Sequence, residues 1–138
     1  MAVIAKLQLG DNGFRRYARE YLLVDFTCRV VRRHNEARPD GSPQFEHMEL
    51  TVVAPGRMDL NLYEWYVGHS SMSGRILIEL PAPSPNQPAD WKEVLFEDGL
   101  CYSIAEDYHI DESVRRTLKL QIVSREVTVD DIVFKSRI

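Results

Sequence analysis

The sequence lacks several features that would point to particular classes of protein. None of its apolar runs is long enough to span a bilayer, and the first nine residues contain no cationic stretch leading into a long apolar block. Lysine and arginine do not gather into a run that could follow a phosphate backbone, and the formal net charge is -4. We therefore expect a protein that is cytoplasmic on synthesis, without a cleaved signal peptide, and that binds neither membranes nor nucleic acid.

Motifs for cofactor binding are also missing. Gly10 and Gly13 are followed by Phe14 and arginines rather than by a lysine-capped helix start, so we expect no phosphate-binding loop. The histidines form neither a His-x-His nor a His-x-x-x-His pair, so a solvated loop or strand surface is the expected place of each: His34, His47, His69 and His109. We expect no metal, no other cofactor and no enzymatic activity.

The residues that could carry catalysis are few and poorly grouped. Each of the two cysteines, Cys28 and Cys101, lies in an apolar strand-like segment where a buried thiol acts as a small hydrophobe, with a structural disulfide as the alternative. A nucleophile and base made of Cys101 and His109 would lack a third residue to orient the base. Glu106-Asp107 and Asp130-Asp131 follow strand patterns, so their neighbouring side chains should point to opposite faces as solvated edges.

What is present is the composition of one globular domain. Hydrophobic residues make up 44% and charged residues 28% of the 138 residues, which is enough apolar material for one core. We therefore expect a single domain over residues 1–138.

Alternation of apolar and polar residues predicts about eight strands. They fall at residues 3–9, 22–30, 48–52, 76–80, 94–96, 100–104, 118–122 and 126–134. The Glu97-Asp98-Gly99 sequence predicts a tight turn between two of them. In the second strand the residues predicted to share one face are Leu22, Val24, Phe26, Cys28 and Val30. This many antiparallel strands favours a closed or nearly closed barrel, which pairs its own edges.

One short helix is predicted over Asp59 to Gly68, with Asp59 or Asn61 at its start and Gly68 at its exit. Three of its residues share a face and are expected to pack on the barrel: Leu62, Trp65 and Tyr66. A helix this short depends on such packing for its stability.

Two segments rich in turn residues interrupt the strands. His34 to Pro43 is too polar to be buried and too rich in turn residues to continue a strand ladder, so it should project as the extended loop of a long hairpin. Pro81 to Pro88 contains four prolines, which cannot donate backbone hydrogen bonds, and is interpreted as an elaborated strand connection.

Three stretches carry a family resemblance. Leu60 to Leu80 reads LNLYEWYVGHSSMSGRILIEL, Lys92 to Tyr108 reads KEVLFEDGLCYSIAEDY, and Asn35 to Pro39 reads NEARP. In this order they resemble the helix and following strand, the Lys-Glu and Phe-Glu elements, and the loop of the Bacteroidetes type of Hcp (TssD) tube proteins of bacterial type VI secretion systems. The resemblance covers the chain from about Phe26 to Phe134.

The resemblance implies a mainly β protein, an antiparallel barrel with one helix alongside, that assembles as hexameric rings stacked into the inner tube of the apparatus. The implied partners are further copies of the chain, the spike protein, the sheath and secreted effectors, and the implied route is secretion through the apparatus itself. The long hairpin is the natural device for reaching a neighbouring subunit. The residues expected in this contact are Arg32, Arg33, His34, Asn35, Glu36, Arg38, Pro39, Asp40 and Gln44.

Some segments depart from the family pattern. Arg15 to Glu20 is more strongly charged than expected, Pro81 to Pro88 looks like an insertion, and Ala37 replaces the glycine before Arg38. Three arginines in this region are interpreted as a contact to an acidic neighbouring subunit: Arg15, Arg16 and Arg19.

Two other classes of function compete with the tube subunit. The first is a monomeric barrel that binds a small ligand in its interior, with Trp91, Phe96 and Tyr102 facing the pocket. The second is a small barrel enzyme of the cupin kind, but the sequence lacks the clustered histidine ligands of such a site.

Overall fold

The computed structural model describes residues 4–35, 38–82, 84–88, 90–110 and 114–136, with residues 32–35, 38–42 and 114 described by their backbone. The predicted mainly β fold with one short helix is confirmed. Its elements are β1 (Ala5–Asp11), β2 (Arg16–Asn35), β3 (Arg38–Val53), α1 (Asn61–Gly68), β4 (Met72–Leu80), β5 (Asp90–Ile110), β6 (Val114–Val123), β7 (Glu126–Val129) and β8 (Ile132–Lys135). No helix in the described part of the chain is both long and apolar enough to traverse a bilayer.

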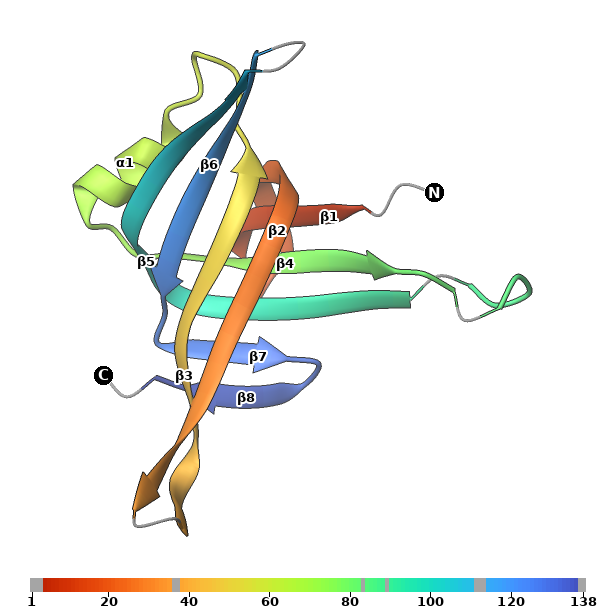
Figure 1. Cartoon of the computed structure of the whole chain (residues 1–138), viewed down its shortest axis with the longest axis vertical. Coiled ribbons are helices and arrows are strands. Elements are labelled where there is room, and N and C mark those ends of the chain that lie inside the picture. The colour runs from red at the N-terminus through yellow and green to blue at the C-terminus, as the bar shows by residue number, and fades with distance from the viewer. Residues whose placement is uncertain (1–3, 36–37, 83, 89, 111–113, 137–138) are drawn as a thin grey trace.

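The strands form an antiparallel barrel (Figure 1). The sheet order is β4-β1-β2-β3-β6-β5, and a further pairing of β4 with β5 closes the ring. The β7–β8 hairpin continues the sheet from the first half of β5. Closure pairs the strand edges with one another, which is how a small β protein avoids open edges.

The predicted turn at Glu97-Asp98-Gly99 is wrong, because β5 continues through these three residues without a break. Asp98 adopts a left-handed φ of 52°, and the register with β4 shifts between Met72 and Gly74. These are the marks of a β-bulge, which bends a strand and increases its twist. The bulge lies where β5 passes from the sheet it forms with β4 and β7 to the ladder it forms with β6.

The predicted inner face of β2 is also wrong at its first residues. Leu22 and Val24 are 58% and 61% exposed, whereas Tyr21 is buried. The register shift between Leu23 and Asp25 explains the difference: an extra residue at Val24 reverses the side-chain alternation, since strand side chains repeat every two residues.

A similar shift affects β5 after its bulge. The bulge at Asp98 reverses the alternation, so Cys101 faces the core, and the register with β6 is irregular again between Cys101 and Ser103. Tyr102, which the ligand-binding hypothesis expects to face the pocket, and Leu100 on the same face of β5 are exposed instead.

The predicted final strand over residues 126–134 is a hairpin rather than one strand. Asp130 and Asp131 have φ values of 47° and 73°, and Val129 pairs with Ile132 across them. Two consecutive left-handed residues define a type I′ turn, whose twist matches that of the flanking strands. These two aspartates therefore form a turn, and not neighbouring positions within a strand.

The core fills the inside of the barrel. Its largest fully buried side chains are Trp65, Phe45, Phe96, Leu7, Leu9, Met48, Leu50, Leu62, Ile76, Leu118, Leu120 and Ile122. They come from the helix and from five of the strands, so the side chains that fill the barrel also fix the helix on it.

The helix α1 is held by its side chains and by its two ends. Leu62 and Trp65 are buried, whereas Tyr66 is 37% exposed. The Trp65 indole Nε1 donates to the Gly99 carbonyl at 3.1 Å. At the start, the Asn61 amide donates to Asp59 Oδ1 at 3.0 Å, and at the end His69, not Gly68, takes the left-handed conformation with a φ of 52°.

The hairpin of β2 and β3 projects well beyond the barrel (Figure 1). The expectation that its ladder stops before His34 to Pro43 is wrong, since the pairing continues to Asn35 and Arg38. The register is irregular between Val31, which pairs with Gln44, and Arg33, which pairs with Asp40. The residues of β3 between Asp40 and Gln44 therefore form a bulge. The Pro81 to Pro88 segment joins β4 to β5 and forms neither helix nor strand in its described residues.

Candidate assembly surfaces

The thiols and acids offer little chemistry. Cys28 and Cys101 are free, and burial raises the pKa of both thiols, that of Cys101 to about 11. A thiol that stays protonated is a poor nucleophile. Within the described residues, no group of three or more His, Cys, Asp and Glu side chains is placed to hold a metal ion.

Glu106 has a structural role that the sequence did not reveal. Its carboxylate accepts hydrogen bonds from the Tyr63 hydroxyl of α1 and, at 2.8 Å, from the Tyr108 hydroxyl, with Arg116 Nη1 at 4.0 Å. The Tyr63 hydrogen bond, above all, lowers the pKa of Glu106. For Tyr63, burial and this hydrogen bond raise the pKa to about 12. The cluster joins α1 to the ends of β5 and β6.

The interior pocket required by the ligand-binding hypothesis is not formed by the predicted residues. Phe96 is fully buried and stacks on Trp65 with ring centroids 6.5 Å apart. Trp91 and Tyr102 are 47% and 46% exposed, because they lie on the outer side of β5. The three aromatic residues therefore do not face one cavity.

The arginines at the β1–β2 turn divide into two groups. Arg15 Nη1 lies 3.4 Å from Glu93 Oε2, which also receives Arg75 Nη1 at 2.9 Å, so Arg15 has an acidic partner within its own chain. Arg16 and Arg19 are exposed on β2. Their contact with an acidic neighbouring subunit stays a prediction.

The predicted contact residues occupy the outer part of the β2–β3 hairpin. Arg32, Arg33, His34 and Asn35 end β2, and Arg38, Pro39, Asp40 and Gln44 lie in β3, with Glu36 outside the described residues. Gln44 is half-buried and pairs with Val31. The described residues of this set therefore lie on one projecting hairpin (Figure 1).

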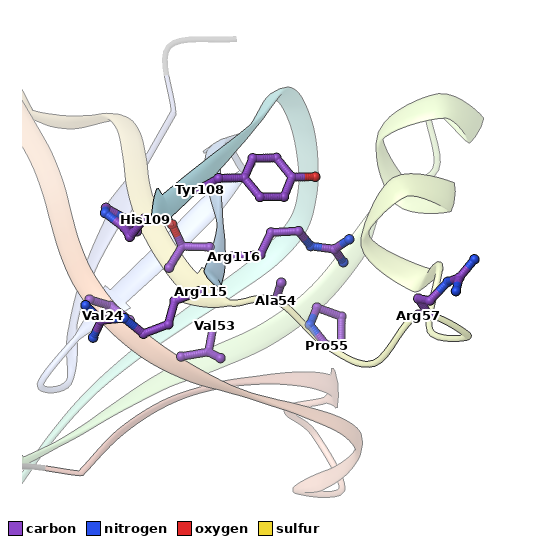
Figure 2. A pocket seen from close by; sticks show the side chains of 10 residues that line it. Val24, Val53, Ala54, Pro55, Arg57, Tyr108, His109, Arg115 and Arg116 are labelled. Atoms are coloured by element: carbon purple, nitrogen blue, oxygen red, sulfur yellow. The ribbon is translucent and has the colours of Figure 1, made fainter. Parts of the chain in front are cut away.

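A groove at the opposite end of the barrel was not predicted (Figure 2). It has a volume of about 640 Å³ and lies where β3, β5 and β6 meet β2 and the segment after β3. Its lining residues are Val24, Val53, Ala54, Pro55, Arg57, Tyr108, His109, Arg115, Arg116 and Thr117. Val24 reaches it because of the bulge in β2. The adjacent Arg115 and Arg116 were the one signal in the sequence that could have marked it.

The whole chain resembles solved Hcp structures. It is 12% identical to Hcp1 from Flavobacterium johnsoniae, with a TM-score of 0.72 over 96% of this chain and 99% of that chain. It is 10% identical to the secreted protein Hcp3 from Pseudomonas aeruginosa, with a TM-score of 0.69 over 99% and 100%. It is 11% identical to an Hcp1 protein from E. coli EAEC 042, with a TM-score of 0.67 over 96% of each.

These identities are low enough that the structural likeness establishes the fold alone. No match was found among curated proteins. The family model for hemolysin coregulated protein Hcp (TssD), however, matches residues 1–137, which is nearly the whole chain. The chain therefore belongs to the Hcp (TssD) family of type VI secretion tube proteins.

Proposed function

We propose that this chain is a structural subunit of the inner tube of a type VI secretion system, in which six copies close a ring and rings stack into a tube. The observation that carries the proposal is the family match over residues 1–137. The role is structural and not enzymatic, and the chain acts as a single domain over residues 1–138.

The architecture suits a subunit that must keep its shape under load. A ring closes only when each copy offers two different, mutually fitting surfaces in a head-to-tail sense. A barrel closed by hydrogen bonds and filled by large buried side chains supplies rigid walls for such surfaces. Rigid walls also fix the angle between neighbours, and that angle decides whether six copies meet.

The β2–β3 hairpin is the element proposed to set the stacking of rings. It extends beyond the barrel, and its outer ladder from Val31 to Gln44 pairs only within the hairpin among the described residues (Figure 1). Backbone groups of such a ladder are available to a strand or loop of the next ring. Apart from Glu36, which is outside the described residues, the contact residues predicted between Arg32 and Gln44 belong to these two strands.

The further partners follow from this role. The spike protein would seat on one end of the tube, the sheath would surround it and secreted effectors would travel within it. The chain itself would leave the cell through the apparatus without a cleaved signal peptide. A solved relative, Hcp3 of Pseudomonas aeruginosa, is described as a secreted protein.

Electron microscopy and light scattering of the purified protein test the proposal. We expect rings in negative stain and a species of six times the 16.0 kDa chain mass in solution. A chain that stays monomeric at high concentration and forms no rings would contradict the proposal. Saturable binding of a small molecule by that monomer would instead support the ligand-binding hypothesis.

A further inference from the structure

The groove of Figure 2 is lined by both cationic and apolar side chains. Val53, Ala54 and Pro55 line it together with cationic side chains that include Arg57 and Arg115. Arg57 is exposed and makes no ion pair with any described residue. An exposed apolar surface with an unbalanced charge is typical of an interaction site rather than of a solvated face.

The turn between β7 and β8 has the opposite character. Asp130 and Asp131 form its two central positions, and they are followed by Ile132 and Val133, which are 61% and 50% exposed. Asp130 is paired with Lys92 of β5. Asp131 is exposed and has no ion pair among the described residues, so its charge is not balanced within the chain.

The groove and the turn do not meet within one molecule. Figure 1 shows the ends of β3 and β5, which line the groove, at the top of the barrel, and the β7–β8 hairpin in its lower half. The Lys92–Asp130 pair and the pairing of β7 with β5 hold the turn in that place. Any contact between the two surfaces must therefore join two copies.

From this complementarity we infer that the Asp130-Asp131 turn of one copy docks into the Arg57 and Arg115 groove of a neighbouring copy. The inference rests on the proposed tube function and names one of the contacts that builds it. The Asp131 carboxylate meets the guanidinium groups, while Ile132 and Val133 cover the apolar floor of the groove. Groove and turn are unlike surfaces, as a head-to-tail assembly requires.

The size of the groove fits this occupant. Its volume of about 640 Å³ lies well within the range of clefts that enclose small ligands, about 300–1,000 Å³, and a two-residue turn is a compact guest. A type I′ turn is also stiff, so little conformational freedom is lost when it docks. Burial of the aliphatic pair adds a contact that salt does not screen.

A double-mutant cycle on the assembled protein tests the inference. Asp131→Asn neutralises the turn, and Arg57→Gln with Arg115→Gln neutralises the groove. Asparagine tolerates the left-handed φ of position 131, so the turn should persist. We expect each neutralisation to raise the dissociation constant of the assembly, measured by analytical ultracentrifugation, by about tenfold. Combining the two should add no further loss, because each removes the same contact.

The matched controls are Asp98→Asn and Arg125→Gln. Asp98 is likewise an exposed aspartate at a left-handed φ, of 52°, and it pairs with Arg125 within the chain at 2.8 Å. Asp98→Asn removes a single negative charge, as Asp131→Asn does, and Arg125→Gln removes a single positive charge, as either groove substitution alone does, so both controls should leave assembly unchanged. Assembly of the unaltered protein should also weaken as NaCl is raised, a readout that needs no variant.

The outcomes separate this inference from the proposed function. Normal rings and tubes from all the neutralised variants, or assembly that is indifferent to salt, would overturn the docking contact and leave the tube function intact. A protein that forms no rings at all would overturn both. Loss of an acidic cargo protein from rings of the Arg57→Gln, Arg115→Gln variant, with assembly unchanged, would assign the groove to cargo and also overturn the inference.

Discussion

At the scale of single residues, the barrel depends on a missing side chain where β1, β4 and β5 come together. A Cβ at Gly74 would lie 2.3 Å from the Gln8 carbonyl oxygen and 3.0 Å from the Phe96 ring. The first of these neighbours is backbone and cannot rotate away. Gly74→Ala should therefore lower the free energy of unfolding by about 2–3 kcal/mol, measured by urea denaturation.

Gly56 provides the matched control for this substitution. A Cβ there would meet nothing within 4 Å, so Gly56→Ala should change the free energy of unfolding by less than about 0.5 kcal/mol. Equal effects of the two substitutions would show that the close approach of β1 to β4 at Gly74 does not determine the free energy of unfolding.

The buried indole of Trp65 anchors α1 through one hydrogen bond and a large contact area. Trp65→Phe would leave the Gly99 carbonyl without its donor and open space beside Phe96. We expect the free energy of unfolding to fall by about 2–3 kcal/mol in thermal or urea unfolding. Trp91→Phe, at an exposed position, should cost less than about 0.5 kcal/mol, and a similar loss from both would contradict this role of Trp65.

At the scale of elements, the Tyr63–Glu106–Tyr108 cluster makes the attachment of α1 to the β5–β6 hairpin sensitive to pH. Since the pKa of Glu106 is lower in the folded than in the unfolded state, its contribution to stability is present above the unfolded pKa. It is lost as the pH falls through the folded pKa. Glu106→Gln should therefore be less stable than the unaltered protein at neutral pH, with the difference closing in acid.

Thermal melts across the acidic range measure this difference. Asp107→Asn is the control, because Asp107 is the exposed neighbour of Glu106 in β5. A Glu106→Gln variant that melts like the unaltered protein at every pH would rule out the cluster as an attachment. Since the pKa of Tyr63 is raised to about 12, a titration of tyrosine absorbance should show a late-ionising hydroxyl that is lost in Tyr63→Phe.

The elements also show what the sequence could predict. Alternation located the strands and the helix because core residues repeat with the period of each element. It failed at Val24, Asp98 and Tyr102, where an extra residue in a bulge reverses the faces beyond it. Bulges are set by pairing with distant strands, and no local pattern specifies them. The turn at Asp130-Asp131 was missed because aspartate is less distinctive than glycine in such turns.

The two candidate surfaces differ in how far the sequence could predict them, because one depends on a local pattern and the other on contacts between distant segments. The projecting hairpin follows from a polar, turn-rich stretch between two strands, which is a local signal. The groove brings Val24, Val53, Arg57 and Arg115 together from separate parts of the chain. The pairing of β2 with β3, of β3 with β6 and of β5 with β6 brings the strand residues of the groove to one end of the barrel, and the segment after β3 adds Arg57.

At the scale of the whole molecule, stacking and ring closure should depend on different parts of the chain. The stacking role proposed for the β2–β3 hairpin predicts that its outer part can be removed without unfolding the barrel. Val31 and Gln44 are paired, so residues 32–43 can be replaced by Asn-Gly, which favours a two-residue type I′ turn. The adjacent core residue Phe45 stays in place.

This shortened chain should keep its melting temperature within a few degrees and still form single rings, because the buried core residues of the barrel are retained. It should no longer form tubes when both proteins are examined by electron microscopy at the same high concentration. A chain shortened within residues 82–88, in the other projecting connection, is the control and should still stack. Tubes from the chain lacking residues 32–43 would contradict the stacking role, since a contact that can be deleted cannot set the register between rings.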